Sequence, residues 1–296
     1  MKAWRWWTDR CDRPVDSRPL ATTRMLLGMC LLLDLFQVLR LGIAPDIFRL
    51  GKYGGLTAFH DPHLVIHNWW GADAGLIAMG ITAACAVMII SGFGTRLAIL
   101  VGVLAYAQLG HHFPPGDRAV DRIIRTGLLV ILFSGAVGPW WRLKGKKMPG
   151  WPVDLLKFIL VMIYLSAGLA KLIQQPGWVS MTAEPPLLRI MADPLSARID
   201  PVFWSEYPWL FRLGSWATIV LELSSVLILS RWCRIWACFG LAMHVGIFAT
   251  MHLGMFSLGM LSLYPVLLAT PLRPSSDDAG AAMKQDKEEG VHRAMP

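Results

Sequence analysis

The sequence predicts an all-α protein, a polytopic transmembrane helical bundle of about eight spans with an extracytoplasmic cap loop. Hydrophobic residues make up 55% of the 296 residues, charged residues only 16%, and the mean hydropathy is +0.48. A soluble domain of this length needs far more surface charge. Apolar runs of about 20 residues recur along the chain, which is the length that a helix needs to cross the hydrocarbon. The short alternating strands of a transmembrane barrel are not seen.

The hydropathy defines the order and limits of the spans. The weakest boundary lies near Gly254, between the last two spans, so seven or nine spans are the alternatives. We expect the spans at residues 20–41, 73–92, 96–110, 119–138, 153–173, 214–230, 235–253 and 255–271.

The distribution of lysine and arginine predicts the orientation in the membrane. With eight spans, three basic segments fall on one side: the amino terminus, the loop at 141–147, and the loop with Arg231 and Arg234. We therefore expect a multi-pass protein of the cell (inner) membrane with both termini in the cytoplasm. The formal charge of +8 then reflects topology and attraction to anionic membrane lipids, and no nucleic-acid partner is predicted.

Three parts of the chain are expected to differ in character. Residues 1–19 form a cytoplasmic amino-terminal segment, and residues 20–271 form the transmembrane domain. Within that domain, residues 174–213 are rich in Pro and Trp and are expected to fold as a cap on the outer side. Residues 272–296 hold Ser, Asp, Lys and Glu without aromatic residues, which predicts a disordered cytoplasmic tail.

Lys171 lies near the outer end of an apolar, membrane-length segment. One interpretation is an anchor whose ammonium reaches the headgroups. The other is a chemical group. Ser166, Ala167 and Gly168 would let a neighbouring helix pack closely and desolvate the amine, which would lower the pKa of a lysine and let it act as a base.

The fourth span opens with a cluster of charges. Asp121 and Arg125 are one helical turn apart and are spaced to form an ion pair, while Arg118, Arg122 and Arg125 form a second stripe. The cluster is either an interfacial anchor or a site where arginines bind an anionic group and Asp121 orients them.

Two further polar residues fall in the middle of predicted spans. His244 is either a hydrogen-bonded packing residue or a proton carrier. Glu222, with Ser224 and Ser225 nearby, is expected to form a hydrogen bond between helices. An ionisable side chain at the bilayer centre costs about 2.5–3.5 kcal/mol on insertion scales, so each needs a partner or a purpose.

Several histidines are predicted on the outer side. His60, His63 and His67 follow a helical spacing, and His111 and His112 fall in the loop before the fourth span. No carboxylate stands at a matching distance, and we predict no metal site.

Five short segments resemble the vitamin K-dependent gamma-carboxylase superfamily, specifically its bacterial horizontally transferred transmembrane domain (HTTM) members. The likeness covers most of residues 13–270, and the segments follow the family order. They are Arg13-Pro-Val-Asp16, Gly92-Phe-Gly-Thr-Arg96, Asp121-Arg-Ile-Ile-Arg125, Tyr164 to Leu172, and His244 with the later run Leu253 to Leu261.

The resemblance implies roles for particular residues. Lys171 would be the base that deprotonates a vitamin K-like reduced quinone, and His244 would act with it in an outward-facing pocket. The resemblance does not extend to the Gly-Gly and Asn before the fourth span, which His111 to Gly116 replace, or to a large luminal domain. Peptide carboxylation itself is therefore not expected. The candidate substrate-binding residues are Asp121, Arg125, His111, His112, Tyr164 and Glu222.

Two functions remain open from the sequence. The first is a membrane enzyme, or an enzyme-derived domain, that acts on a quinol or a similar lipid-soluble substrate with Lys171 as base. The second is a non-catalytic membrane protein that binds a lipid or a partner through the cap at residues 174–213. The sequence does not identify a protein partner.

Overall fold

The computed structural model describes residues 8–9, 11–49, 51–56, 70–193, 195–199 and 206–269, and these residues are mostly helical. The expected all-α fold is confirmed. The main helices are α2 (Arg18–Arg40), α5 (Ala74–Ser91), α6 (Thr95–His112), α7 (Ala119–Leu132), α8 (Trp151–Gln174), α11 (Pro208–Leu223), α12 (Cys233–Thr250) and α13 (Phe256–Leu261). The shorter elements are β1 (Pro14–Asp16), α3 (Ala44–Phe48), β2 (Lys147–Pro149), α9 (Pro186–Ala192) and the 3₁₀ helices η1 (Gly51–Tyr53), η2 (Gly71–Asp73), η3 (Pro114–Gly116), η4 (Trp140–Leu143), η5 (Pro176–Trp178), η6 (Ser224–Leu229) and η7 (Tyr264–Leu268).

Five of the described helical segments are long and apolar enough to cross a membrane. A further apolar segment, Phe256–Leu268, is shorter. The chain is therefore an integral membrane protein, while the number of eight spans stays a prediction. The five segments are Arg18–Arg40, Gly71–Ser91, Trp151–Gln174, Pro208–Leu229 and Cys233–Thr250.

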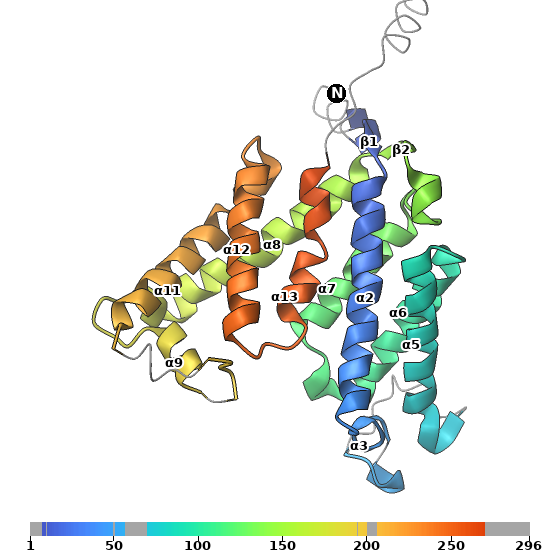
Figure 1. The fold of residues 1–296 in the computed structure, drawn as a ribbon, viewed down its shortest axis with the longest axis horizontal. Coiled ribbons are helices and arrows are strands. Elements are labelled where there is room, and N and C mark those ends of the chain that lie inside the picture. Colours follow the sequence, from blue (N-terminus) through green and yellow to red (C-terminus); the bar gives the residue numbers. More distant parts are fainter. Residues whose placement is uncertain are drawn as a thin grey trace, which may run out of the picture.

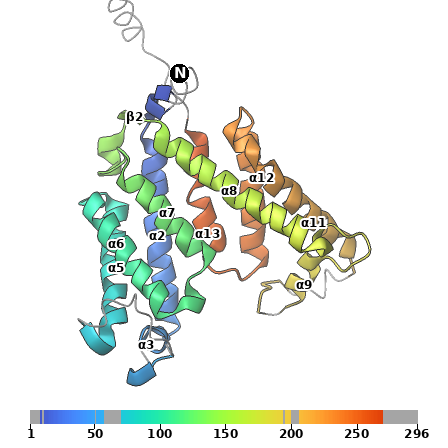
Figure 2. The ribbon, with the colours of Figure 1, turned by 180° about the vertical axis from the view of Figure 1, so that it is seen from behind.

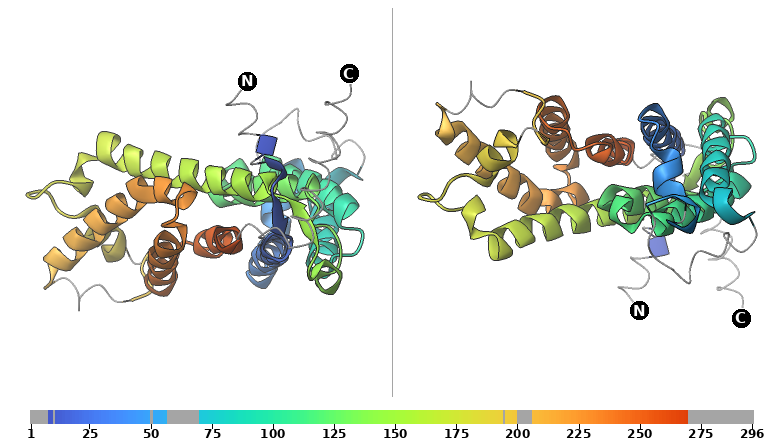
Figure 3. Two further views of the ribbon diagram at one scale, coloured as in Figure 1. Left: turned by 90° about the horizontal axis from the view of Figure 1, so that it is seen from above. Right: turned by 90° about the horizontal axis from the view of Figure 1, so that it is seen from below.

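The helices form two groups connected by α8 (Figure 1). One group contains α2, α5, α6 and α7, and the other contains α11, α12 and the small cap helix α9. Seen from behind, α8 runs diagonally from β2 to α11 (Figure 2). The end-on views show α7 and α8 in one layer, with α2, α13 and α12 in a second layer (Figure 3). Side chains of α8 consequently face partners from both groups.

A short pair of antiparallel strands joins the beginning of α2 to the beginning of α8. Asp16 in β1 stands opposite Lys147 in β2, and Arg13 donates to Asp154 at 2.7 Å between Nη2 and Oδ1. Ser17 donates to the carbonyl oxygen of Leu143. These strands were not predicted, because three residues in each of two distant segments carry no periodic signal.

A buried arginine connects three other segments near this end. Arg24 in α2 is fully buried, and its guanidinium donates to the carbonyl oxygen of Gly138 at 2.7 Å and to the hydroxyl of Thr95 at 3.2 Å. Thr95 opens α6, and Gly138 follows α7. Gly92 also packs here, in a left-handed conformation with φ of +86°. In the segment Gly92 to Arg96, Thr95 therefore provides a hydrogen-bond acceptor for Arg24, and Gly92 allows close contact with the backbone of Gly138.

The segment after α8 packs against the end of α12. The backbone N–H of Arg198 donates to the carbonyl oxygen of Thr250, and that of His252 donates to the carbonyl oxygen of Ser196. The described part of residues 174–213 is thus folded against the bundle. Other predicted features lie outside the described residues, namely the tail at 272–296 and the histidines His60, His63 and His67.

We predict that Gly92→Ala destabilises the protein by more than about 1 kcal/mol, because alanine disfavours a positive φ. The new Cβ would also lie 2.4 Å from the carbonyl oxygen of Gly138. Gly80→Ala is the matched control, since a Cβ there meets no atom within 4 Å. Thermal unfolding of both purified variants in detergent checks this, and equal melting temperatures would contradict it.

Candidate functional site

Lys171 forms an ion pair with Glu222 across the contact between α8 and α11. Its Nζ lies 2.7 Å from Oε1 and 2.9 Å from Oε2 of the carboxylate. The side chains of Lys171 and Glu222 are only 21% and 8% exposed. The ring of Trp178 also lies beside the ammonium, 5.3 Å from Nζ to the ring centroid. The amine is therefore directed toward the protein and is not a freely extended anchor.

A glycine permits this close approach of the two helices. A Cβ built at Gly168 would lie 3.0 Å from the Cβ of Glu222 and 3.1 Å from a methyl group of Leu223. The expectation of close helix packing beside Lys171 is thus confirmed at Gly168. Ser166 in the same segment is exposed and donates to the carbonyl oxygen of Ile163.

Tyr164, two turns before Lys171 on the same face of α8, joins a buried group of aromatic and polar rings. Its hydroxyl lies 2.6 Å from Nε2 of His244 and 2.9 Å from the hydroxyl of Tyr264. His244 is fully buried. Gly240 makes room for Tyr264, because a Cβ there would lie 2.2 Å from the tyrosine hydroxyl. His244 therefore has a specific hydrogen-bonded partner within the bundle.

The ion pair and the ring group lie along one face of α8. Tyr164, Gly168 and Lys171 follow the spacing i, i+4 and i+7, so they lie on one side of the helix. Tyr164 and Lys171 are about 10 Å apart along the axis at ~1.5 Å per residue. We call the side chains of Lys171, Glu222, Tyr164, His244 and Tyr264 the polar seam. Four of them were predicted as site residues.

Tyr264 was missed by the sequence analysis. Its sequence signal is a single tyrosine hydroxyl in the last apolar segment, directly before Pro265. A buried hydroxyl needs a hydrogen-bond partner, but nothing local indicates that the partner is a side chain 100 residues earlier.

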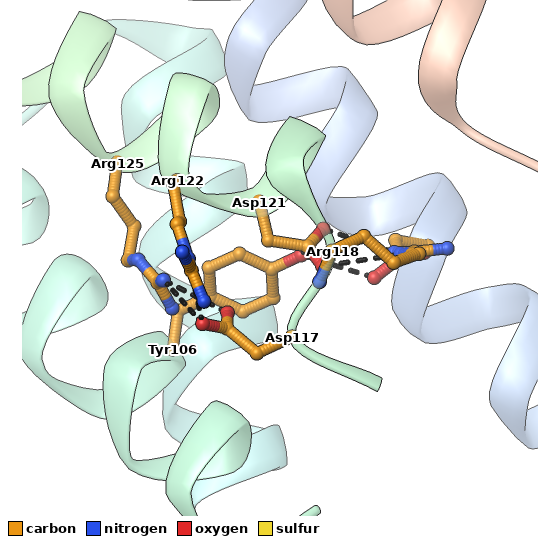
Figure 4. Close-up of polar contacts among 7 residues, drawn as sticks. Tyr106, Asp117, Arg118, Asp121, Arg122 and Arg125 are labelled. Carbon is orange, nitrogen blue, oxygen red and sulfur yellow. Dashed lines mark hydrogen bonds and ion pairs between the residues drawn. The ribbon is translucent and has the colours of Figure 1, made fainter. Parts of the chain in front are cut away.

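A second polar group lies between α2, α6 and α7 (Figure 4). The guanidinium of Arg118 contacts Asp34 and Asp121, with 2.9 Å between Nη2 and Oδ1 of Asp121. The hydroxyl of Tyr106 lies 2.7 Å from Asp121 and 3.1 Å from Asp34. The first described long helix, α2, thus shares one charged network with the consecutive helices α6 and α7. Neither Tyr106 nor Asp34 was predicted as a site residue.

The predicted ion pair between Asp121 and Arg125 is not formed. Arg125 instead donates to Asp117 at 2.8 Å, and its guanidinium lies 5.8 Å from the ring centroid of Tyr106. Asp121 accepts from the backbone N–H and the side chain of Arg118, which closes the first turn of α7. Because the Asp121 carboxylate caps the first turn of α7, it does not contact Arg125, which lies one turn later.

The electrostatics of this group are dominated by its carboxylates. Burial alone would lower the pKa of the Arg118 guanidinium, but hydrogen bonds and charge from Asp121 and Asp34 raise that pKa above its ordinary value. Arg118 therefore stays protonated and is shared by the two carboxylates.

A cavity of about 200 Å³ opens beside these charges. Its lining includes Asp34, Tyr106, Asp117, Arg118 and Arg125, together with apolar side chains of α2, α3 and α6. Neither Lys171 nor His244 lines it. The single pocket expected to join Lys171, His244, Asp121 and Arg125 is therefore divided into two separate groups. His111 and His112 end α6 near the second group, but they do not line the cavity.

Metal binding has no support from the described side chains. Within residues 8–9, 11–49, 51–56, 70–193, 195–199 and 206–269, no group of three or more His, Cys, Asp or Glu side chains could hold a metal ion.

The helical architecture and buried charges define an integral membrane protein with a polar interior. Residues 138–273 match the family model of the HTTM domain, so this part of the chain is similar to that domain. The matched segment includes the polar seam and excludes the Arg118 network. No curated protein and no solved structure matches the chain.

We predict that Arg118→Met destabilises the protein by about 2 kcal/mol or more, because Asp34 and Asp121 lose a shared cation in a buried site. This loss of stability is smaller than that expected for a fully buried pair, since the Arg118 side chain is 39% exposed. Arg122→Met is the matched control. Its side chain is 71% exposed, so its pair with Asp117 should contribute less than about 1 kcal/mol. Denaturation in detergent distinguishes the two, and equal losses would contradict the assignment.

Proposed function

We propose that this protein is a membrane enzyme that removes a proton from a quinol or another lipid-soluble substrate, with Lys171 as the base and Glu222 as its partner. The observation that carries the proposal is the ion pair between them, since Nζ of Lys171 lies 2.7 Å from Oε1 of Glu222. The resemblance to the gamma-carboxylase superfamily supports the same role for Lys171.

The chemistry follows from the proton that Lys171 and Glu222 share. When that proton rests on Glu222, the amine of Lys171 is neutral and can accept the proton of a substrate hydroxyl. The resulting ammonium then faces the substrate anion and stabilises it, while Glu222 stays neutral. Low dielectric surroundings strengthen this attraction. The Lys171 side chain keeps a small exposed fraction, which gives the substrate access.

The rest of the polar seam supports proton transfer near this pair. The hydroxyl of Tyr164 contacts both His244 and Tyr264. Within the part of the chain that the structure describes, Nδ1 of His244 has no hydrogen-bond partner. A buried imidazole with one engaged and one unengaged nitrogen can pass a proton between its two sides. We assign His244 this role, with Tyr164 as its hydrogen-bonded partner.

The second candidate is a non-catalytic protein that binds a lipid or partner through the cap. The observation that favours it is an apolar outer surface on the described part of residues 174–213, where Leu195 and Trp209 are exposed. Under this alternative Lys171 serves to hold α8 against α11.

We predict that Lys171→Met abolishes deprotonation of a bound reduced naphthoquinone, followed anaerobically by the absorbance of its anion. Lys171→Arg should fail as well, because guanidinium stays protonated. Lys157→Met, which makes the same change at an earlier position of α8, should behave as wild type.

The folding of these variants needs its own check, because Lys171→Met leaves Glu222 buried without a cation. The double variant Lys171→Met with Glu222→Gln removes both charges and keeps the helix contact. Loss of deprotonation in this double variant, with unchanged thermal unfolding, supports the proposal. Full activity in Lys171→Arg would reject it and leave the structural role.

A further inference from the structure

We propose that the apolar groove between α11 and α12 binds one acyl chain of an anionic phospholipid, with the lipid phosphate at Arg231 and Arg234. The groove has a volume of about 720 Å³. Its walls include Leu221 and Leu227 from the α11 side and Trp232, Phe239 and Ile247 from the α12 side. This site is separate from the ion pair of Lys171 and from the Arg118 network.

The polar atoms of the groove are already used. The hydroxyl of Thr218 donates to the carbonyl oxygen of Gly214, and that of Thr250 donates to Gly246, each at 2.8 Å. Ser224 donates to Leu221, and the indole N–H of Trp236 donates to the same carbonyl oxygen at 3.0 Å. These groups do not require a polar ligand, so the groove fits a hydrocarbon chain.

Small residues keep the groove hollow. Gly214, Ala217, Ala242 and Gly246 all contribute to its lining. A Cβ built at Gly246 meets no atom within 4 Å, so this glycine faces open space rather than a packed neighbour. The hollow is therefore a property of the groove surface, which a larger side chain at Gly246 would fill without a clash at its Cβ.

The groove is long enough to hold one acyl chain, which spans about half of the ~30 Å hydrocarbon core, and it runs in a suitable direction. Its lining extends from Trp232 to Met251, along all 18 residues of α12. That helix is about 27 Å long at ~1.5 Å per residue, close to the ~30 Å thickness of the hydrocarbon core. A groove that follows a membrane-spanning helix runs in the same general direction as the surrounding acyl chains.

One end of the groove carries positive charge. Arg231 and Arg234 are exposed, and the guanidinium of Arg231 lies 5.3 Å from the ring centroid of Trp232 in the groove wall. This end is on the same side of the molecule as β1 and β2 (Figure 1). Tryptophan and arginine at the end of a membrane helix are suited to the headgroup level. The charge selects an anionic phosphate-bearing headgroup over a free fatty chain.

Native mass spectrometry of the full chain tests the proposal. Protein would be titrated with dioleoyl phosphatidylglycerol, and we expect one phospholipid to remain bound to the wild type. Gly246→Phe should lose this binding because the ring fills the hollow. Gly80→Phe is the matched control on α5, since a Cβ at Gly80 also meets no atom within 4 Å. Arg231→Gln with Arg234→Gln should weaken binding roughly 10- to 30-fold.

Other ligands and variants separate the alternatives. Arg142→Gln with Lys144→Gln, two exposed residues of another loop, should bind as the wild type does. Dihexanoyl phosphatidylglycerol and glycerol phosphate should bind more weakly by at least tenfold, since they lack the long chain. Equal binding by these short probes would overturn the proposal, as would unchanged binding by Gly246→Phe. A wild-type dimer that Gly246→Phe dissociates would show that a second copy covers the groove instead.

Discussion

Pairing of buried charges is the constraint on which this bundle depends. A single ionisable side chain at the centre of a bilayer costs about 2.5–3.5 kcal/mol on insertion scales. Two of the described ion pairs of the interior join different segments. Lys171 in α8 meets Glu222 in α11, and Arg118 before α7 meets Asp34 in α2. Each pair is therefore also a contact between helices, and the charge positions help to determine which helices pack together.

Hydropathy and helix length predicted most of the elements, because burial in hydrocarbon is a local property of the sequence. Hydropathy did not predict the places where a helix ends inside an apolar run. The span expected at 119–138 ends at Leu132, where Ser134 donates to the carbonyl oxygen of Ile131 and the chain turns toward Gly138. Likewise, α11 changes to the 3₁₀ helix η6 after Leu223. Such endings depend on specific hydrogen bonds and glycines, which a hydropathy average does not register.

The sequence predicted which polar residues form hydrogen bonds inside the bundle better than it predicted their partners. Lys171, Glu222, Tyr164 and His244 were all identified, but their contacts are with residues 51 to 100 positions away. The local spacing rule chose Arg125 for Asp121, whereas Arg118 occupies that carboxylate from the N-terminal side. Long-range partners follow from the packing of α8 and α11, and of α2 and α7, which a single sequence does not specify.

Trp236 connects the groove to the polar seam. Its indole lines the groove, while its ring lies edge-on to Tyr164 with 4.9 Å between the centroids. The N–H is fixed by the carbonyl oxygen of Leu221, directly before Glu222. A chain in the groove therefore packs against the same indole that positions Tyr164 beside His244. Filling the groove would restrict the movement of this indole, because a packed neighbour removes the space into which it could turn. Trp236 thus contributes both to the wall of the groove that would hold the lipid chain and to the packing around the hydrogen-bonded Tyr164.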